Sequence, residues 1–153
     1  MKLYYYIHNI DASADLAFTT SAEPIKRSGN TWIELSETDL EKYRLHIKYI
    51  NYCSIGADGD LKCDYIQVLS QKLSELDSSV KNKIKQLRML LLEASAMDNK
   101  SVVAEIAGVI KSLNEFIKGD FSGITDIDQI ENITCAELHI DYVEYYESEI
   151  YGI

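Results

Sequence analysis

The sequence predicts an α+β fold: a mainly antiparallel sheet from N- and C-terminal strands, packed against a helix and a long antiparallel helical hairpin. Aromatic and β-branched residues concentrate near both ends of the chain, and heptads of apolar residues fill its middle. A length of 153 residues, 46% of them hydrophobic, is typical of one globular domain. We expect a single domain, 1–153, with a β-rich part containing one helix (1–64), a helical hairpin (65–118) and an acidic, tyrosine-rich C-terminal strand region (120–153).

Three segments of the N-terminal part have the composition of strands. Lys2 to His8 is aromatic and branched, and the polar stretch after it predicts a turn. Leu16 to Thr20 then predicts a short returning strand. A loop follows at 21–30, where Pro24 precedes the cluster Ser28-Gly29-Asn30, and Thr31 to Leu35 predicts the third strand.

A helix is predicted over 37–50. Ser36 is a suitable N-cap, and Asp39 stands where a capping box places its acidic partner. The apolar residues that recur at helical spacing and define one face are Leu40, Tyr43, Ile47 and Ile50.

The dipeptide Asp58-Gly59 is the strongest hairpin signal in the chain. Cys53 and Cys63 flank this turn and could lie near each other across the two strands. Because an odd number of cysteines and the lack of export signals favour a reducing compartment, we expect two packed thiols here in preference to a disulfide.

The middle of the chain predicts one helix of about 30 residues, roughly 45 Å long. Its heptad positions are Ile66, Leu73, Val80, Leu87 and Ala94, then Leu69, Leu76, Lys83, Leu90 and Met97. A reversal near Asp98 leads to a second helix that ends at Gly119, with Val103, Ile106, Ile110, Leu113 and Ile117 on one stripe. The second helix is about half as long as the first. Part of the first stripe therefore needs another cover: the sheet, a second copy or a different protein.

The C-terminal region alternates in polarity from Thr134 to Tyr146, which predicts a strand. Its buried face would carry Ala136, Leu138, Ile140 and Tyr142, and its acidic face Cys135, Glu137, His139 and Asp141. The tyrosines at 142, 145, 146 and 151 could belong to an interface, or could pack on the tyrosines at 4, 5 and 6 within one sheet.

Negative charge is concentrated at the C-terminal end. Of the formal net charge of −10, residues 120–153 supply nine acidic residues and no lysine or arginine, while residues 1–119 hold 25 − 9 = 16 acidic against 15 basic residues. This field opposes direct binding of nucleic acid or an anionic membrane. It favours a basic partner protein or serves solubility.

The residue pattern of a catalytic, cofactor or metal site is missing. Asp58, Asp60 and Asp64 lack the remaining ligands of a calcium loop, and the three histidines lie on separate predicted elements. Cys135 and His139 would stand about 13 Å apart along a strand, too far to share a proton. We therefore expect no enzyme, cofactor or metal.

Two further features concern the surface and the location of the protein. Lys81, Lys83, Lys85 and Arg88 form a modest basic patch whose alternate spacing should wrap it around the long helix, so we expect a solvated surface there. The chain has no apolar run of the length that a membrane span needs, and its first residues are polar too early for a signal peptide, which favours a cytoplasmic location.

The N-terminal third of the chain contains KLYYYI, a polar loop, TWIELSETDLEKY and then ADGDLK. This layout resembles small bacteriophage tail-fibre assembly and tail-associated accessory proteins over residues 2–64, and residues 66–118 resemble their helical half in type. The resemblance implies a chaperone-like role in folding or capping a fibre tip, in the host cytoplasm or on the virion, and transfers no binding residue. The acidic segment after Gly119 departs from that layout.

Two hypotheses of non-catalytic protein binding follow. A tail or fibre assembly protein would dock on a fibre protein, or on its own copies as a homo-oligomer, through the apolar helix stripe that includes Leu73 and Leu87. An acidic inhibitor, such as an immunity or anti-defence protein, would cover the nucleic-acid-binding surface of a basic target protein. The residues proposed for that contact are Glu137, Asp141, Glu144, Tyr145, Glu147 and Glu149.

Overall fold

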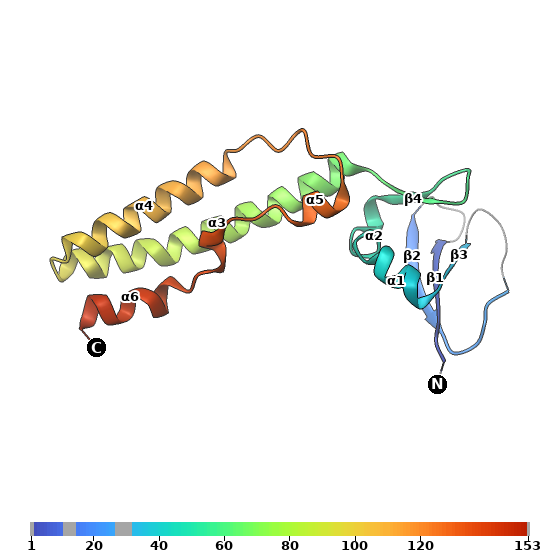
Figure 1. The fold of residues 1–153 in the computed structure, drawn as a ribbon, viewed down its shortest axis with the longest axis horizontal. Helices are drawn as coiled ribbons and strands as arrows, with labels where there is room; N and C mark the ends of the chain where they lie inside the picture. The colour runs from blue at the N-terminus through green and yellow to red at the C-terminus, as the bar shows by residue number, and fades with distance from the viewer. Residues whose placement is uncertain (1, 11–14, 27–31, 153) are drawn as a thin grey trace. The chain divides into compact units, whose positions relative to one another are not determined.

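The computed structural model describes residues 2–10, 15–26 and 32–152. Contacts within the chain divide it into two compact units (Figure 1). The first unit comprises residues 1–70 and 125–131, and the second comprises residues 71–124 and 132–153. The α+β class is confirmed, with a three-stranded and a two-stranded antiparallel sheet and a long helical hairpin. The expected organisation as a single domain stays a prediction.

The three-stranded sheet of the first unit has the order β2-β1-β3. Its strands are β1 (Tyr4–Asn9), β2 (Leu16–Ser21) and β3 (Trp32–Leu35), close to the predicted bounds. Both neighbours pair antiparallel with β1, so that Ile7 stands opposite Phe18 on one side and Ile33 on the other. The predicted turn at 11–14 and loop residues 27–31 lie outside the described residues.

The helix predicted over 37–50 is divided into α1 (Glu37–Lys42), α2 (Arg44–Lys48) and the 3-10 helix η1 (Ile50–Tyr52). Ser36 and Asp39 form the expected capping box, with hydrogen bonds of 3.1 Å and 3.0 Å. The chain leaves helical geometry at Tyr43 and Tyr49, where ψ is 13° and 29°. All four predicted apolar residues still pack on the sheet core. The apolar spacing thus predicted correctly which side chains pack on the core, but it wrongly predicted one unbroken helix.

The hairpin predicted at Asp58-Gly59 is confirmed as β4 (Cys53–Ile55) and β5 (Leu61–Cys63). Gly59 has φ of +79°, a value that glycine reaches without steric cost. Cys53 and Cys63 are direct partners across this ladder and form a disulfide, so the expected pair of free thiols is wrong. The turn sets a register that brings the two side chains together.

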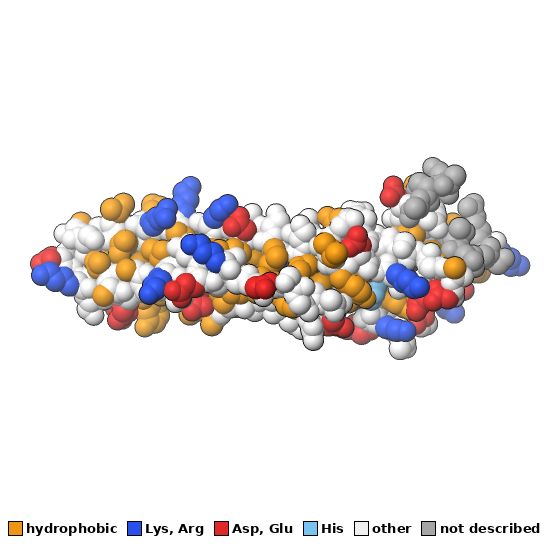
Figure 2. Space-filling model, turned by 90° about the horizontal axis from the view of Figure 1, so that it is seen from above, with side chains coloured by type: hydrophobic (Ala, Val, Ile, Leu, Met, Phe, Trp, Pro, Cys, Tyr) orange, Lys and Arg blue, Asp and Glu red, His pale blue; other side chains and the backbone are white. Residues whose placement is uncertain are grey.

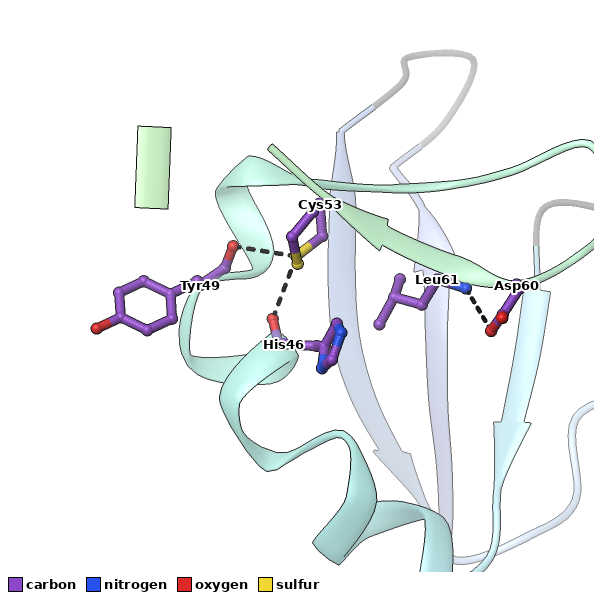
Figure 3. Close-up of a disulfide and its surroundings, with 6 residues drawn as sticks. His46, Tyr49, Cys53, Asp60 and Leu61 are labelled. Atoms are coloured by element: carbon purple, nitrogen blue, oxygen red, sulfur yellow. Dashed lines mark hydrogen bonds between the residues drawn. A yellow bond between two sulfur atoms is a disulfide. The ribbon is translucent and has the colours of Figure 1, made fainter. Parts of the chain in front are cut away.

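Figure 3 shows the surroundings of this disulfide. The carbonyl oxygens of His46 and Tyr49 lie 3.6 Å and 3.4 Å from Cys53 Sγ. Because a disulfide sulfur has no proton to donate, these distances describe packing contacts. The cross-link therefore joins β4 to β5, and its Cys53 sulfur packs against the backbone of His46 and Tyr49.

Helix α5 (Ile127–Glu131) belongs to the first unit although it follows the whole helical hairpin in sequence. Ile127 and Ile130 are buried, and Glu131 joins the helix to α2. The Glu131 carboxylate accepts hydrogen bonds from Lys48 Nζ at 2.6 Å and from the Tyr49 hydroxyl at 2.7 Å. Apolar burial and a shared carboxylate thus hold α5 in place.

The long helical hairpin is confirmed. Helix α3 (Tyr65–Ala96) has 32 residues and α4 (Lys100–Ile117) has 18, as the heptads and the stop signal predict. The turn between them places Asp98 at φ of +53°, and Asn99 caps α4 by accepting a hydrogen bond from the Val102 N–H at 3.2 Å.

The strand predicted from Thr134 to Tyr146 is wrong. The segment forms the 3-10 helix η2 (Ala136–His139) and α6 (Tyr142–Tyr151), which lies beside α3 in Figure 1. Tyr142, Tyr146 and Ile150 pack with the buried residues of α3 and α4, and the tyrosines do not join a C-terminal strand. Helix α6 therefore covers, together with α4, the part of the α3 stripe from Val80 to Ala94.

The disulfide should stabilise the first unit by restricting its unfolded chain. For the separation of 10 residues between Cys53 and Cys63, replacing both with serine should lower the free energy of unfolding by about 2–3 kcal/mol. Denaturant unfolding followed by circular dichroism measures this loss. Alkylation of the unfolded chain without reductant should label Cys135 alone, and labelling of all three cysteines would contradict the assignment.

Candidate protein-binding surface

Helix α6 has well-defined signals at both ends. Asp141 caps it by accepting a hydrogen bond from the Glu144 N–H at 3.2 Å. Gly152 ends it at φ of +68°, and its N–H donates to the Ser148 carbonyl at 2.8 Å. Between these caps, an aromatic or aliphatic side chain recurs every fourth residue and is buried. The capping residues and the spacing of the buried side chains thus both favour a helix over Tyr142–Tyr151.

The outward side of α6 carries glutamates among exposed aromatic and aliphatic side chains. Tyr145 is 55% exposed and Tyr151 is 48% exposed. We call this surface the acidic face; its residues are Val143, Glu144, Tyr145, Glu147, Glu149 and Tyr151. Because glutamate supplies charge and tyrosine supplies contact area at low entropic cost, the face has the composition of a docking surface for a basic protein.

Hydrogen bonds from three points hold α6 against the hairpin. The Tyr146 hydroxyl donates to Glu105 on α4 at 3.3 Å, and Asn99 Nδ2 donates to the Glu149 carbonyl at 3.2 Å. Tyr151 is hydrogen-bonded to Glu93 on α3. The outward glutamates are therefore displayed from a helix whose position is fixed by its neighbours.

These contacts change the acidity of the tyrosines. Burial and the nearby Glu105 charge raise the pKa of Tyr146 to about 12. The hydrogen bond to Glu93 raises the pKa of Tyr151, and burial raises the pKa of Tyr142. All three hydroxyls consequently stay protonated well above neutral pH.

The structure brings most of the proposed acidic contact residues together. Glu144, Tyr145, Glu147 and Glu149 share α6, whereas Asp141 is its cap and Glu137 is half-buried in η2. Their role in binding stays a prediction. Of the two proposed stripe residues, Leu73 is half-buried and Leu87 is completely buried in the core of the helical unit. Leu87 therefore serves folding, and its side chain is not available to a partner.

A groove runs between the outer sides of α3 and α4. We call it the basic groove; its volume is about 590 Å³ and its lining residues are Lys81, Ile84, Lys85, Arg88, Met89, Leu92 and Asn114. Figure 2 shows basic side chains gathered among apolar ones over these helices. Lys81, Lys85 and Arg88 have the spacing i, i+4 and i+7, which places them on one face of α3.

The expectation that the four basic residues wrap around α3 is therefore wrong for three of them. Only Lys83 points elsewhere: its Nζ donates to the Ile140 carbonyl at 2.8 Å and lies 5.9 Å from the centre of the Tyr142 ring. Lys81 pairs with Asp77 at 2.7 Å. Within the part of the chain that the structure describes, Lys85 and Arg88 have no carboxylate partner.

The cysteine and histidines do not converge on a reactive centre. Burial raises the pKa of the Cys135 thiol, which disfavours the nucleophilic thiolate. His139 Nε2 lies 2.9 Å from the Thr134 hydroxyl, and burial lowers the pKa of His46. Among residues 2–10, 15–26 and 32–152, no group of three or more His, Cys, Asp or Glu side chains is arranged to hold a metal ion.

No family model matches the chain, and no curated protein or solved structure shows a match to it. None of the described helices has both the length and the apolar character of a membrane span. The functional assignment consequently depends on the chemistry of the surfaces described above.

The pKa of Tyr146 predicts how the helical unit responds to alkali. Because its folded value of about 12 exceeds the unfolded value near 10, the stability it contributes is complete below pH 10 and is lost as pH rises to 12. Tyr146→Phe should make unfolding less sensitive to pH across this interval. Denaturant midpoints by circular dichroism measure it, with Tyr145→Phe as the exposed control; equal pH dependence of Tyr146→Phe and wild type would contradict the assignment.

Proposed function

We propose that this chain is a non-catalytic protein-binding protein that uses the acidic face of α6 to bind a basic surface of another protein. The observation that supports this most is the display of Glu144 and Glu147 beside exposed Tyr145 and Tyr151 on a helix fixed by its neighbours. Residues 120–153 contain no lysine or arginine that would neutralise this charge.

The most suitable partner is a protein whose basic surface binds nucleic acid. Glutamates at the spacing i and i+3 present two carboxylates on one side of the helix, as a phosphate backbone presents successive negative charges. A partner that docks on the acidic face would lose access to its nucleic acid. Charge attraction would make this association fast and sensitive to salt. The chain would then act as an acidic inhibitor.

A second candidate function is the assembly of a tail fibre or a similar structure through α3. Its support is that some apolar side chains of this helix stay exposed: Ile66 is 82% exposed and Leu92 is 72% exposed. The heptad stripe itself is covered by α4 and α6 from Val80 to Ala94. An assembly contact would therefore use exposed residues of α3 such as Leu92, in place of the buried Leu87.

Charge reversal distinguishes the two candidates. Glu144→Lys with Glu147→Lys should abolish capture of a basic partner from extracts of the native host, because the attraction becomes repulsion. Glu41→Lys with Glu75→Lys changes the net charge equally at exposed sites elsewhere and serves as the control. Captured proteins are identified by mass spectrometry, and binding of each purified partner is then titrated.

The inhibitor proposal makes two further demands on that partner. Its affinity for the wild-type chain should fall roughly tenfold or more from low to moderate salt. The wild-type chain should also displace nucleic acid from the partner. Retention of the same partner by the α6 variant, or binding that is insensitive to salt, would contradict the acidic-face mechanism and favour contact through α3.

A further inference from the structure

We propose that the basic groove of one copy binds the acidic face of α6 from a second copy, so that the chain self-associates through two unlike surfaces. This inference goes beyond the proposed function, because it assigns a ligand to the basic groove and does not require a foreign partner. Three observations support it: two groove cations without a carboxylate partner among the described residues, a matching residue pattern on α6, and matching lengths.

The groove combines cations with apolar surface that the fold itself leaves uncovered. Lys85 and Arg88 lack a carboxylate partner among the described residues, although the chain carries a net charge of −10. Beside them, Leu92 is 72% exposed and Met89 is 60% exposed. Such a surface fits a ligand that is both acidic and amphipathic.

The acidic face of α6 repeats the pattern of the groove with opposite charge. Along α3, Lys85, Arg88 and Leu92 have the spacing i, i+3 and i+7. Along α6, the same spacing is occupied by Glu144, Glu147 and Tyr151. If the two helices pack side by side in parallel, each glutamate stands opposite a cation and Tyr151 stands opposite Leu92.

The lengths of the two surfaces also agree. Helix α6 has 10 residues and is therefore about 15 Å long. The α3 wall of the groove runs from Lys81 to Leu92, which corresponds to a rise of about 16 Å. One α6 is thus about as long as the wall against which it would lie.

The copy that donates α6 must be a second molecule. Within one molecule, Tyr142, Tyr146 and Ile150 bury the inner side of α6 in the core with α3 and α4. The exposed side of α6 therefore cannot reach the groove of its own molecule, although Glu147 and Tyr151 lie near Met89 and Glu93 of their own α3. Nucleic acid is the less suitable ligand for the groove, because the net charge of −10 repels a polyanion that approaches Lys85 and Arg88.

Self-association would cover the acidic face that the proposed function uses. Dilution or a basic partner would then release it by mass action. Two copies could each donate α6 to the other, which gives a closed two-fold dimer, or the unlike contacts could continue from copy to copy.

Sedimentation velocity on the full chain tests the proposal. The wild type should associate at low salt and dissociate as salt is raised. Lys85→Glu with Arg88→Glu should weaken self-association about tenfold or more, because the groove then repels the glutamates. Lys42→Glu with Arg44→Glu makes the same change in net charge and composition at exposed sites of the first unit, and should leave association unchanged.

A charge swap makes the test specific for this pair of surfaces. Glu144→Lys with Glu147→Lys should also give a monomer, and an equimolar mixture of the two double variants should associate again because each groove now meets an opposite charge. A chain carrying all four substitutions should likewise recover association. Circular dichroism and thermal unfolding confirm that each variant is folded.

Each outcome supports or overturns the inference. A wild type that stays monomeric at low salt and high protein concentration overturns it, as does association that survives the Lys85 and Arg88 substitutions. Failure of the mixture to associate overturns the assigned pairing. The proposed function is judged separately: the groove variant should still bind the basic partner, so loss of self-association with retained partner binding separates the two.

Discussion

Burial of Tyr142, Tyr146 and Ile150 against α3 and α4 is the constraint on which the helical unit depends. Helices α4 and α6 together bury the α3 stripe from Val80 to Ala94, and the leucine and valine side chains there would favour aggregation if they were exposed. Helix α6 helps to remove this surface from water, and the same packing contacts fix the orientation of α6. Its polar side must then face outward. The acidic face is thus a consequence of how the core is completed, and the basic groove lies on an exposed side of α3 with Asn114 of α4 at its edge.

Sequence patterns predicted the fold where one signal dominated. The heptads of the middle segment, the Ser36–Asp39 capping box and the Asp58-Gly59 turn all recur in the structure. The C-terminal strand failed because residues 135–142 alternate in polarity by accident, while the repeat of four that places Tyr142, Tyr146 and Ile150 on one side of a helix starts at their end. Asp141 and Gly152, a cap at each end, were the signals that could have corrected it.

The surfaces were predictable only in part, because the exposure of one side of a helix depends on which elements pack against its other side. The sequence proposed Glu144, Glu147 and Leu87 as contact residues; both glutamates are exposed, whereas α4 and α6 bury Leu87. The basic residues of α3 are close together in sequence, and with Lys83 included they do not show a helical spacing. Without it, the other three have the spacing i, i+4 and i+7. The disulfide depended on the register of a short hairpin, which brought Cys53 opposite Cys63. Composition alone could not show this.

The position of α5 has a consequence for how the protein is made. Because Glu131 and the buried side of α5 belong to the first unit, the chain passes between the two units at 70/71, 124/125 and 131/132. Neither unit is a continuous stretch of sequence, so a fragment that ends at Ser70 would lack the carboxylate that bonds Lys48 and Tyr49. During synthesis, the first unit can be completed only after residue 131 has left the ribosome, when the α3–α4 hairpin has already been translated.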